Sequence, residues 1–343
     1  MKQVERLSPP NFIDICYRTL CIISENQLRE CIHKWLSPPD PSTNHNIACG
    51  THHKKTATWF FEGNIYKEWK SKGSLLWIHG KRAPRLPIIS IASMTLYCSR
   101  LGQEYSLVRR SLAPSLHDRL LMLYTSSMVI EDIRALCDTG QASMAYFYLD
   151  FRNANKQCLR DLLPSLLTQL SARSSPRCDI LSELYSVHDN GKNQPSDGVL
   201  TKCLQDMLSL TDQCPIYLIM DALDESPVTS EIPSARERVL QLLKELVDLD
   251  LPKLHICVTS RPEIDIRNAI EPLTSLRVSL HDQTGQKEDI ADYVRSIVYS
   301  NSDTNMKRWK KEDKEIVVKT LSERADGMYV NQFMFMILSQ TFK

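Results

Sequence analysis

Residues 216–225 read IYLIMDALDE, an apolar run of strand length that leads directly into the acids Asp221, Asp224 and Glu225. An unbroken apolar run is typical of a strand that is buried on both faces, as in a parallel sheet. Carboxylates that follow such a strand lie at the carboxyl edge of the sheet, where nucleotide-handling folds hold Mg²⁺ through water. The pattern predicts Asp221 as the Mg²⁺ residue, and Asp224 and Glu225 as catalytic groups that orient or deprotonate an attacking water. The alternative is a strand followed by the acidic start of a helix, which Asp and Glu favour.

Further apolar runs of strand length alternate with amphipathic segments. The strands are expected at 75–79, 144–149, 254–258 and 276–280. The helices are expected at 159–173, 199–210, 235–249 and 287–300, with a last one at 312–325. This alternation predicts an α/β fold, with a parallel sheet flanked by helices.

The strand expected at 254–258 ends in Thr259, Ser260 and Arg261, which should lie at the same sheet edge as Asp221. The planar guanidinium of Arg261 suits phosphate oxygens, so this residue is a candidate for binding a nucleotide. The alternative is a surface arginine that begins a turn before Pro262. After the strand at 144–149, Asp150 and Arg152 are expected to form a local ion pair.

The chain before the first strand divides into two segments. Residues 1–36 form an N-terminal helical segment, because apolar residues recur at helical intervals from Asn11 to Leu36. Prolines at 38, 39 and 41 end that pattern, and the polar stretch up to Thr58 is expected to be a linker. A helix at 59–69 completes the segment 37–74, which precedes a core at 75–300. A C-terminal helical segment, 301–343, stops short of where we expect further domains.

Residues 82–127 interrupt the alternation. They contain prolines at 84, 87 and 114, arginine pairs and serine–leucine clusters without a steady period. A whole strand–helix–strand unit needs only ~30 residues, so the connection between the first two strands is unusually long. We interpret 82–127 as an atypical insert of foreign sequence, from a retained intron or an alternative splice choice.

Composition and net charge exclude several classes of protein and of binding partner. The 343 residues carry a formal net charge of +1, so no strong field favours nucleic acid or anionic lipid. No continuous apolar run approaches the ~20 residues that span a bilayer, and residues 1–10 lack the apolar core of a secretory signal. Eleven cysteines without a Cys-x-x-Cys pair favour a cytoplasmic setting. The spacing of Cys31, His33, Cys49, His52 and His53 matches no standard zinc site, and we interpret them as ordinary residues.

Four motifs follow one another in a characteristic order: WIHGK at 77–81, MAYFYLDFR at 144–152, LIMDALDES at 218–226 and VTSRPE at 258–263. In this order they resemble the NACHT module of fungal STAND proteins, which are P-loop NTPases, including the N-terminal region typical of nephrocystin 3. The resemblance implies Mg²⁺ with ATP or GTP as cofactors. It also implies a signal-transduction role, in which nucleotide exchange repositions downstream helical and repeat domains and permits self-association or binding of protein partners.

The sequence departs from this family after its first strand. The Walker A pattern G-x-x-x-x-G-K-S/T, started at Gly80, needs glycine, lysine and serine or threonine at 85–87, where this chain has Arg85, Leu86 and Pro87. Gly80 and Lys81 remain as candidate cofactor-binding residues, although Lys81 belongs to the start of the loop.

Three functions remain open. The first is a signalling module that is degenerate in nucleotide binding, binds no nucleotide here and retains a binding or scaffold role. The second is an active ATP or GTP hydrolase, so whether the chain is an enzyme is undecided. The third is an unstable product of a decaying duplicated gene.

Overall fold

Five parallel strands form a sheet in the computed structural model, which describes residues 26–50, 58–80, 114–210, 214–280, 295, 299 and 310–324. Their order across the sheet is β2-β3-β4-β1-β5. Their bounds are β1 Ser74–His79, β2 Ser143–Tyr148, β3 Ile216–Asp221, β4 Leu254–Ser260 and β5 Leu276–Ser279. All five lie where the apolar runs predict them, and the predicted α/β class is confirmed.

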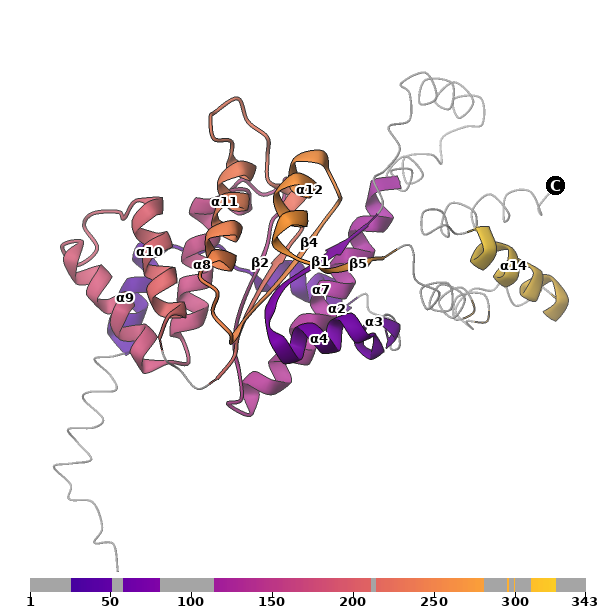
Figure 1. The fold of residues 1–343 in the computed structure, drawn as a ribbon, viewed down its shortest axis with the longest axis horizontal. Coiled ribbons are helices and arrows are strands. Elements are labelled where there is room, and N and C mark those ends of the chain that lie inside the picture. Colours follow the sequence, from indigo (N-terminus) through magenta and orange to yellow (C-terminus); the bar gives the residue numbers. More distant parts are fainter. Residues whose placement is uncertain are drawn as a thin grey trace, which may run out of the picture.

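β1 occupies an interior position, between β4 and β5 (Figure 1). Its register with β4 pairs Ser74 with His255 at one end and His79 with Ser260 at the other. β4 in turn pairs with β3, and β3 with β2, all in parallel. The carboxyl ends of β1, β3 and β4 therefore lie at one edge of the sheet, here called the carboxyl edge.

Successive residues of each strand alternate between two apolar layers, as the two-residue period of a strand requires. In β3, Leu218 and Met220 belong to one layer, whereas Tyr217 and Ile219 belong to the other. The first layer, the α8 face, is covered by α8 (Leu159–Ser171), α10 (Asp197–Leu208), α11 (Ala235–Asp248) and α12 (Ile264–Ile270). The second layer, the α7 face, is covered by α3 (Thr58–Glu62), α4 (Asn64–Lys72) and α7 (Pro114–Asp138).

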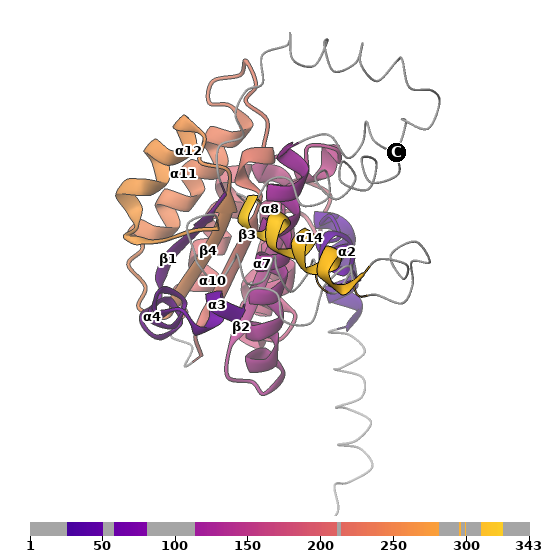
Figure 2. The same ribbon diagram turned by 90° about the vertical axis from the view of Figure 1, so that its right-hand side faces the viewer.

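The remaining helices extend these layers. α9 (Ser175–Val187) packs against α8 and α10 (Figure 1). α2 (Ser42–Gly50) packs against α7 (Figure 2). Residues 26–36 are helical, and α14 spans Lys311–Arg324. Short 3₁₀ turns occupy Ala154–Lys156 (η1), Leu223–Glu225 (η2) and Glu271–Leu273 (η3).

The buried side chain of Trp69 attaches α4 to the sheet. Its indole Nε1 donates to the carbonyl oxygens of Ser74 and Ile256, both at 3.1 Å. Its own carbonyl accepts from Nδ1 of His255 at 2.9 Å, and the His255 ring stacks on Tyr217 with centroids 4.4 Å apart. Burial lowers the pKa of His255, so the neutral ring that donates through Nδ1 is favoured.

The stretch after Pro41 corrects one prediction, because α2 forms where the sequence predicts a linker. The Asp40 carboxylate accepts from the Ser42 amide at 2.8 Å and from the Thr43 hydroxyl at 3.0 Å, as a helix-capping residue does. His45 and Ala48 are buried. Capping and packing on α7 thus stabilise a helix that the polar sequence alone does not predict.

The predicted end of the insert near residue 127 has no counterpart in the structure, since α7 runs through it without a break. Met122 is buried in the α7 face, and the Ser127 hydroxyl lies 2.9 Å from the hydroxyl of Tyr148 in β2. Residues 122–127 therefore belong to the core. The rest of the predicted insert up to 113, the part of the predicted N-terminal helical segment up to 25 and nearly all of the helix predicted at 287–300 lie outside the described residues.

We predict that Met122→Ala lowers the free energy of unfolding by about 2–5 kcal/mol, because Met122 is only 3% exposed and its loss leaves a cavity. Urea unfolding of the full chain measures this difference. Ile264→Ala is the control, since Ile264 is 60% exposed, and it should change the stability by less than about 0.5 kcal/mol. Equal effects of the two variants would contradict the assignment of 122–127 to the core.

Candidate functional site

The first described helix after β1 and the helix after β4 lie on opposite faces of the sheet. The connection from β1 to β2 includes α7, whereas the connection from β4 to β5 includes α12 on the α8 face. In open α/β sheets, ligands bind outside the carboxyl ends of two such neighbouring strands. The topology therefore places the candidate site beside His79 and Ser260, where the Trp77 indole Nε1 of β1 also donates to the Ser260 hydroxyl of β4 at 2.9 Å.

Asp221 lies at this edge as the last residue of β3 and is 4% exposed. The Thr259 hydroxyl donates to its Oδ1 at 2.6 Å and accepts from the amide of Ala222 at 2.9 Å. Ala222 has φ 59° and ψ 50°, a left-handed conformation that alanine rarely adopts, and it turns the chain sharply after the strand. Burial, with the Asp221 charge as a further cause, raises the pKa of Tyr148 and of Cys257.

Asp224 and Arg261 form an ion pair in which the carboxylate is buried and the guanidinium is partly exposed. Arg261 donates to the Asp224 carboxylate twice, from Nε to Oδ2 at 2.6 Å and from its backbone amide to Oδ1 at 2.9 Å. The Asp224 side chain is 4% exposed. Although burial opposes the effect, the Asp224 charge raises the pKa of Arg261. Asp224, predicted to act on the attacking water, and Arg261, predicted to bind phosphate, thus bind each other.

Glu225 connects the loop after β3 to the loop after β2. Its Oε2 accepts from the amide of Phe151 at 3.2 Å, and the residue is 6% exposed. Arg236 of α11 supports the same loop, since it donates to the carbonyl oxygens of Asp224 at 2.6 Å and Ser226 at 2.9 Å. The loop is therefore held from two sides.

Four of the predicted site residues come together at the carboxyl edge: Asp221, Asp224, Glu225 and Arg261. Gly80 follows β1 directly and is buried, so it also lies at this edge, whereas Lys81 is outside the described residues. The sequence indicates Thr259 only as a polar group at the end of a strand and does not show that it bonds to Asp221. Arg236 carries no signal in the sequence, because its contact depends on the packing of α11.

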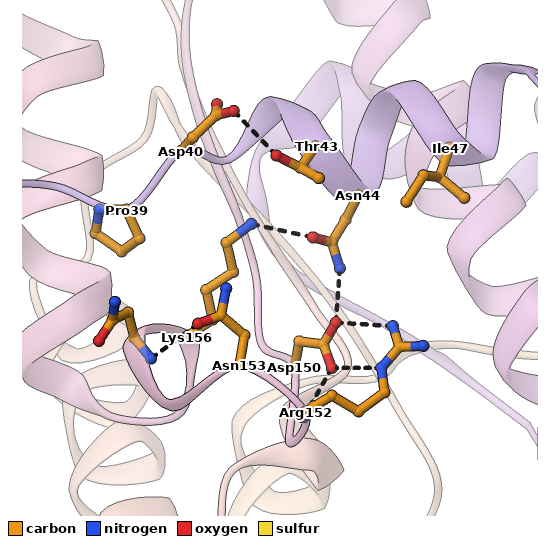
Figure 3. A pocket seen from close by; sticks show the side chains of 10 residues that line it. Pro39, Asp40, Thr43, Asn44, Ile47, Asp150, Arg152, Asn153 and Lys156 are labelled. Carbon is orange, nitrogen blue, oxygen red and sulfur yellow. Dashed lines mark hydrogen bonds and ion pairs between the residues drawn. The ribbon is translucent and has the colours of Figure 1, made fainter.

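A polar pocket of about 440 Å³ lies beside this site, where the chain leaves β2 (Figure 3). It is lined by Pro39, Asp40, Thr43, Asn44, Ile47, Asp150, Arg152, Asn153, Asn155 and Lys156. The buried Lys156 donates to the Asn44 side chain at 3.0 Å, and Asn44 donates to Asp150 at 3.2 Å. Arg152 donates to both oxygens of Asp150, at 3.0 and 2.8 Å, which confirms the local ion pair that the sequence predicts. Burial would raise the pKa of Asp150, but the bonds from Arg152 outweigh it and hold that pKa well below its usual range.

Comparison with known proteins finds a match to a protein family. Residues 124–261 match the family described as Nephrocystin 3, N-terminal. The matched segment starts within α7 and ends at Arg261, so it contains Asp221, Asp224 and Glu225. With the all-parallel sheet, this match supports a P-loop NTPase-like fold. A search of curated proteins finds no match.

Two solved structures illustrate the structural similarity. The Aeropyrum pernix ORC2 protein, solved as ADPNP–ADP complexes, aligns with 80% of this chain at 10% identity and a TM-score of 0.41. Drosophila ORC bound to DNA aligns with 96% of this chain at 13% identity and a TM-score of 0.38. The alignments cover 60% and 61% of those chains, respectively.

Within the part of the chain that the structure describes, no helix has the length and apolar character needed to cross a bilayer.

We predict that Arg261→Ala lowers the free energy of unfolding by roughly 2–4 kcal/mol, because it leaves the buried Asp224 carboxylate without its cation. Urea unfolding measures the loss, and a double-mutant cycle with Asp224→Ala isolates the pair. Arg173→Ala is the control, since Arg173 and its partner Asp138 are 66% and 59% exposed, and it should cost less than about 1 kcal/mol. A coupling energy near zero between Arg261 and Asp224 would show that the pair does not stabilise the fold.

A second prediction concerns acid stability. A lowered pKa in the folded state stabilises the protein above the unfolded pKa of about 3.9, and this contribution disappears as the pH falls through the folded value. Arg152→Gln should therefore cost up to about 1 kcal/mol at neutral pH, since Arg152 is 60% exposed, and progressively less below about pH 4. Urea midpoints of both proteins at several pH values measure this, and a difference that does not depend on pH would contradict it.

Proposed function

We propose that this chain is a nucleotide-binding-type α/β module with a degenerate phosphate site, which acts as a binding or scaffold module in signal transduction. The observation that carries the proposal is the sequence after β1, with Arg85, Leu86 and Pro87 where a Walker A loop has glycine, lysine and a hydroxyl residue. A polyphosphate leaves water only for backbone amides and a fixed cation, and Pro84 and Pro87 have no amide hydrogen to donate.

The charges at the carboxyl edge support the same conclusion. Arg261 is already bonded to the Asp224 carboxylate through two atoms. If its guanidinium moved to a terminal phosphate, the buried Asp224 carboxylate would keep the Arg261 amide but lose its cation, at a cost of about 2–4 kcal/mol. Nucleotide binding would have to offset that cost before any net affinity appeared.

The alternative is an active ATP- or GTP-binding NTPase that regulates self-association. Asp221 would hold Mg²⁺, Glu225 or Asp224 would position water and Arg261 would contact the γ-phosphate. One observation favours it, because these residues converge at the position where open α/β sheets bind ligands. In both cases, protein partners or further copies would be engaged through helical and repeat domains like those of the fungal NACHT proteins.

We predict that the full chain binds neither Mg·ATP nor Mg·GTP with micromolar affinity. Isothermal titration should give no specific heat, and 1 mM nucleotide should leave the melting temperature unchanged. A ligand present at 100 times its Kd would instead stabilise the folded state by about 2.7 kcal/mol, which is several degrees for a domain of this size.

Asp221→Ala distinguishes the two candidates. Under the degenerate-site proposal, this substitution changes neither the Mg·ATP nor the Mg·GTP titration. Micromolar binding by the natural chain that Asp221→Ala removes would overturn the proposal in favour of the active NTPase. Circular dichroism and a cooperative melt must first show that both proteins are folded, and a chain that is unfolded under native conditions would instead support a decaying gene product.

A further inference from the structure

Three side chains that can bind a metal ion lie together between α2 and α7, apart from the carboxyl-edge acids. His45 and Cys49 are four positions apart on α2, so both project from the same side of that helix. Glu131 reaches them from α7, and the possible ligand atoms of the three residues all lie within 4.8 Å of one another. Among the described residues, no other three histidine, cysteine or acidic side chains place their possible ligand atoms this close together.

The distances suit a tetrahedral zinc ion. Cys49 Sγ lies 3.5 Å from His45 Nε2. Zinc bonds of ~2.3 Å to sulfur and ~2.0 Å to nitrogen, at a tetrahedral angle of roughly 109°, separate the two ligand atoms by about 3.5 Å. Glu131 Oε1 lies 2.8 Å from the same nitrogen in a hydrogen bond. A zinc ion would widen that separation to about 3.3 Å, which requires only a small rotation of the exposed glutamate side chain.

A second layer of contacts holds the His45 ring. His45 Nδ1 lies 3.3 Å from the hydroxyl of Tyr148, which in turn lies 2.9 Å from the hydroxyl of Ser127. Each hydroxyl can donate or accept, so Nδ1 keeps a partner whether or not it carries the proton. When Nδ1 carries it, the lone pair of Nε2 points toward Cys49 and Glu131. Such a second contact on a ligand histidine is typical of metal sites.

The surroundings of the three side chains are compatible with this role. His45 is 2% exposed, so packing holds its ring, whereas Cys49 and Glu131 are exposed. One group opposes a cation: Nη1 of Arg134 lies 2.5 Å from Glu131 Oε1. Arg134 is partly exposed and can move into solvent when the carboxylate turns to an ion.

We propose that His45, Cys49 and Glu131 bind Zn²⁺, with water in the fourth position. Thiolate, imidazole and carboxylate together suit zinc, and three protein ligands leave one position open. The site links α2 to α7 and does not depend on the function of the carboxyl edge. Because Cys49 and Glu131 are exposed, an ion can reach it from solvent.

Metal titration of the full chain tests the site. After treatment with a chelator, the protein is titrated with Co²⁺, and the thiolate-to-metal charge-transfer band in the near ultraviolet is followed. Zn²⁺ is then added to displace the cobalt. We expect one equivalent to bind, Cys49→Ser to abolish the band, and Glu131→Gln to weaken binding at least tenfold. Cys31→Ser is the control, since Cys31 is also an exposed free cysteine, and it should leave the titration unchanged.

Two further variants separate a built site from chance binding at a cysteine. Tyr148→Phe should weaken Zn²⁺ binding about 10–100-fold, as loss of a second-layer contact does. Arg134→Gln should strengthen it, because a competing cation is removed. No saturable band in the natural chain would overturn the proposal. So would a band that persists in Glu131→Gln and in His45→Ala but disappears when His52 and His53 are both replaced by alanine.

Discussion

The interior position of β1, with parallel hydrogen bonds to β4 and to β5, constrains the rest of the structure. Parallel neighbours cannot be joined by a tight turn, so each connection must cross a face of the sheet, and helices carry out most of these crossings. Both faces are therefore largely buried, which is why the interior strands are mostly apolar. Because crossovers between parallel strands are right-handed, the connections from β1 to β2 and from β4 to β5, which run in opposite directions along the sheet, place α7 and α12 on opposite faces. The carboxyl edge is thus a product of topology, before any particular side chain is considered.

The side chains at that edge are bonded mainly to one another. Asp221, Asp224 and Glu225 are each less than a tenth exposed, and a carboxylate withdrawn from water needs donors or a cation nearby. Thr259, Arg261 and the amide of Phe151 supply them. Side chains of these types could hold a metal and a phosphate. In this structure they instead make internal contacts, which stabilise the loops after β2, β3 and β4. Retention of the acids is therefore compatible with a structural role.

The strands were predictable from the sequence, because a strand that is buried on both faces needs an unbroken apolar run, and few other short elements show that pattern. α2 and α9 were not, since their apolar residues lack a clear helical period and tertiary contacts such as those of His45 stabilise them. The sequence places Asp224 and Arg261 at one edge but contains no information on the 2.6 Å contact between residues 37 positions apart. The cluster on α2 and α7 was missed for the same reason, because His45 and Glu131 are 86 positions apart.

The attachment of α2 has a consequence for where a minimal autonomous unit can begin. Asn44 bonds to Asp150 and Lys156 after β2, and His45 contacts Tyr148 within it. A fragment that starts at Ser74, the first residue of the sheet, would lack α2. The side chains bonded to Asn44 and His45 would lose these partners, and part of α7 would be exposed. A recombinant piece that keeps these contacts must therefore include Asp40, which caps α2, more than thirty residues upstream of the first strand.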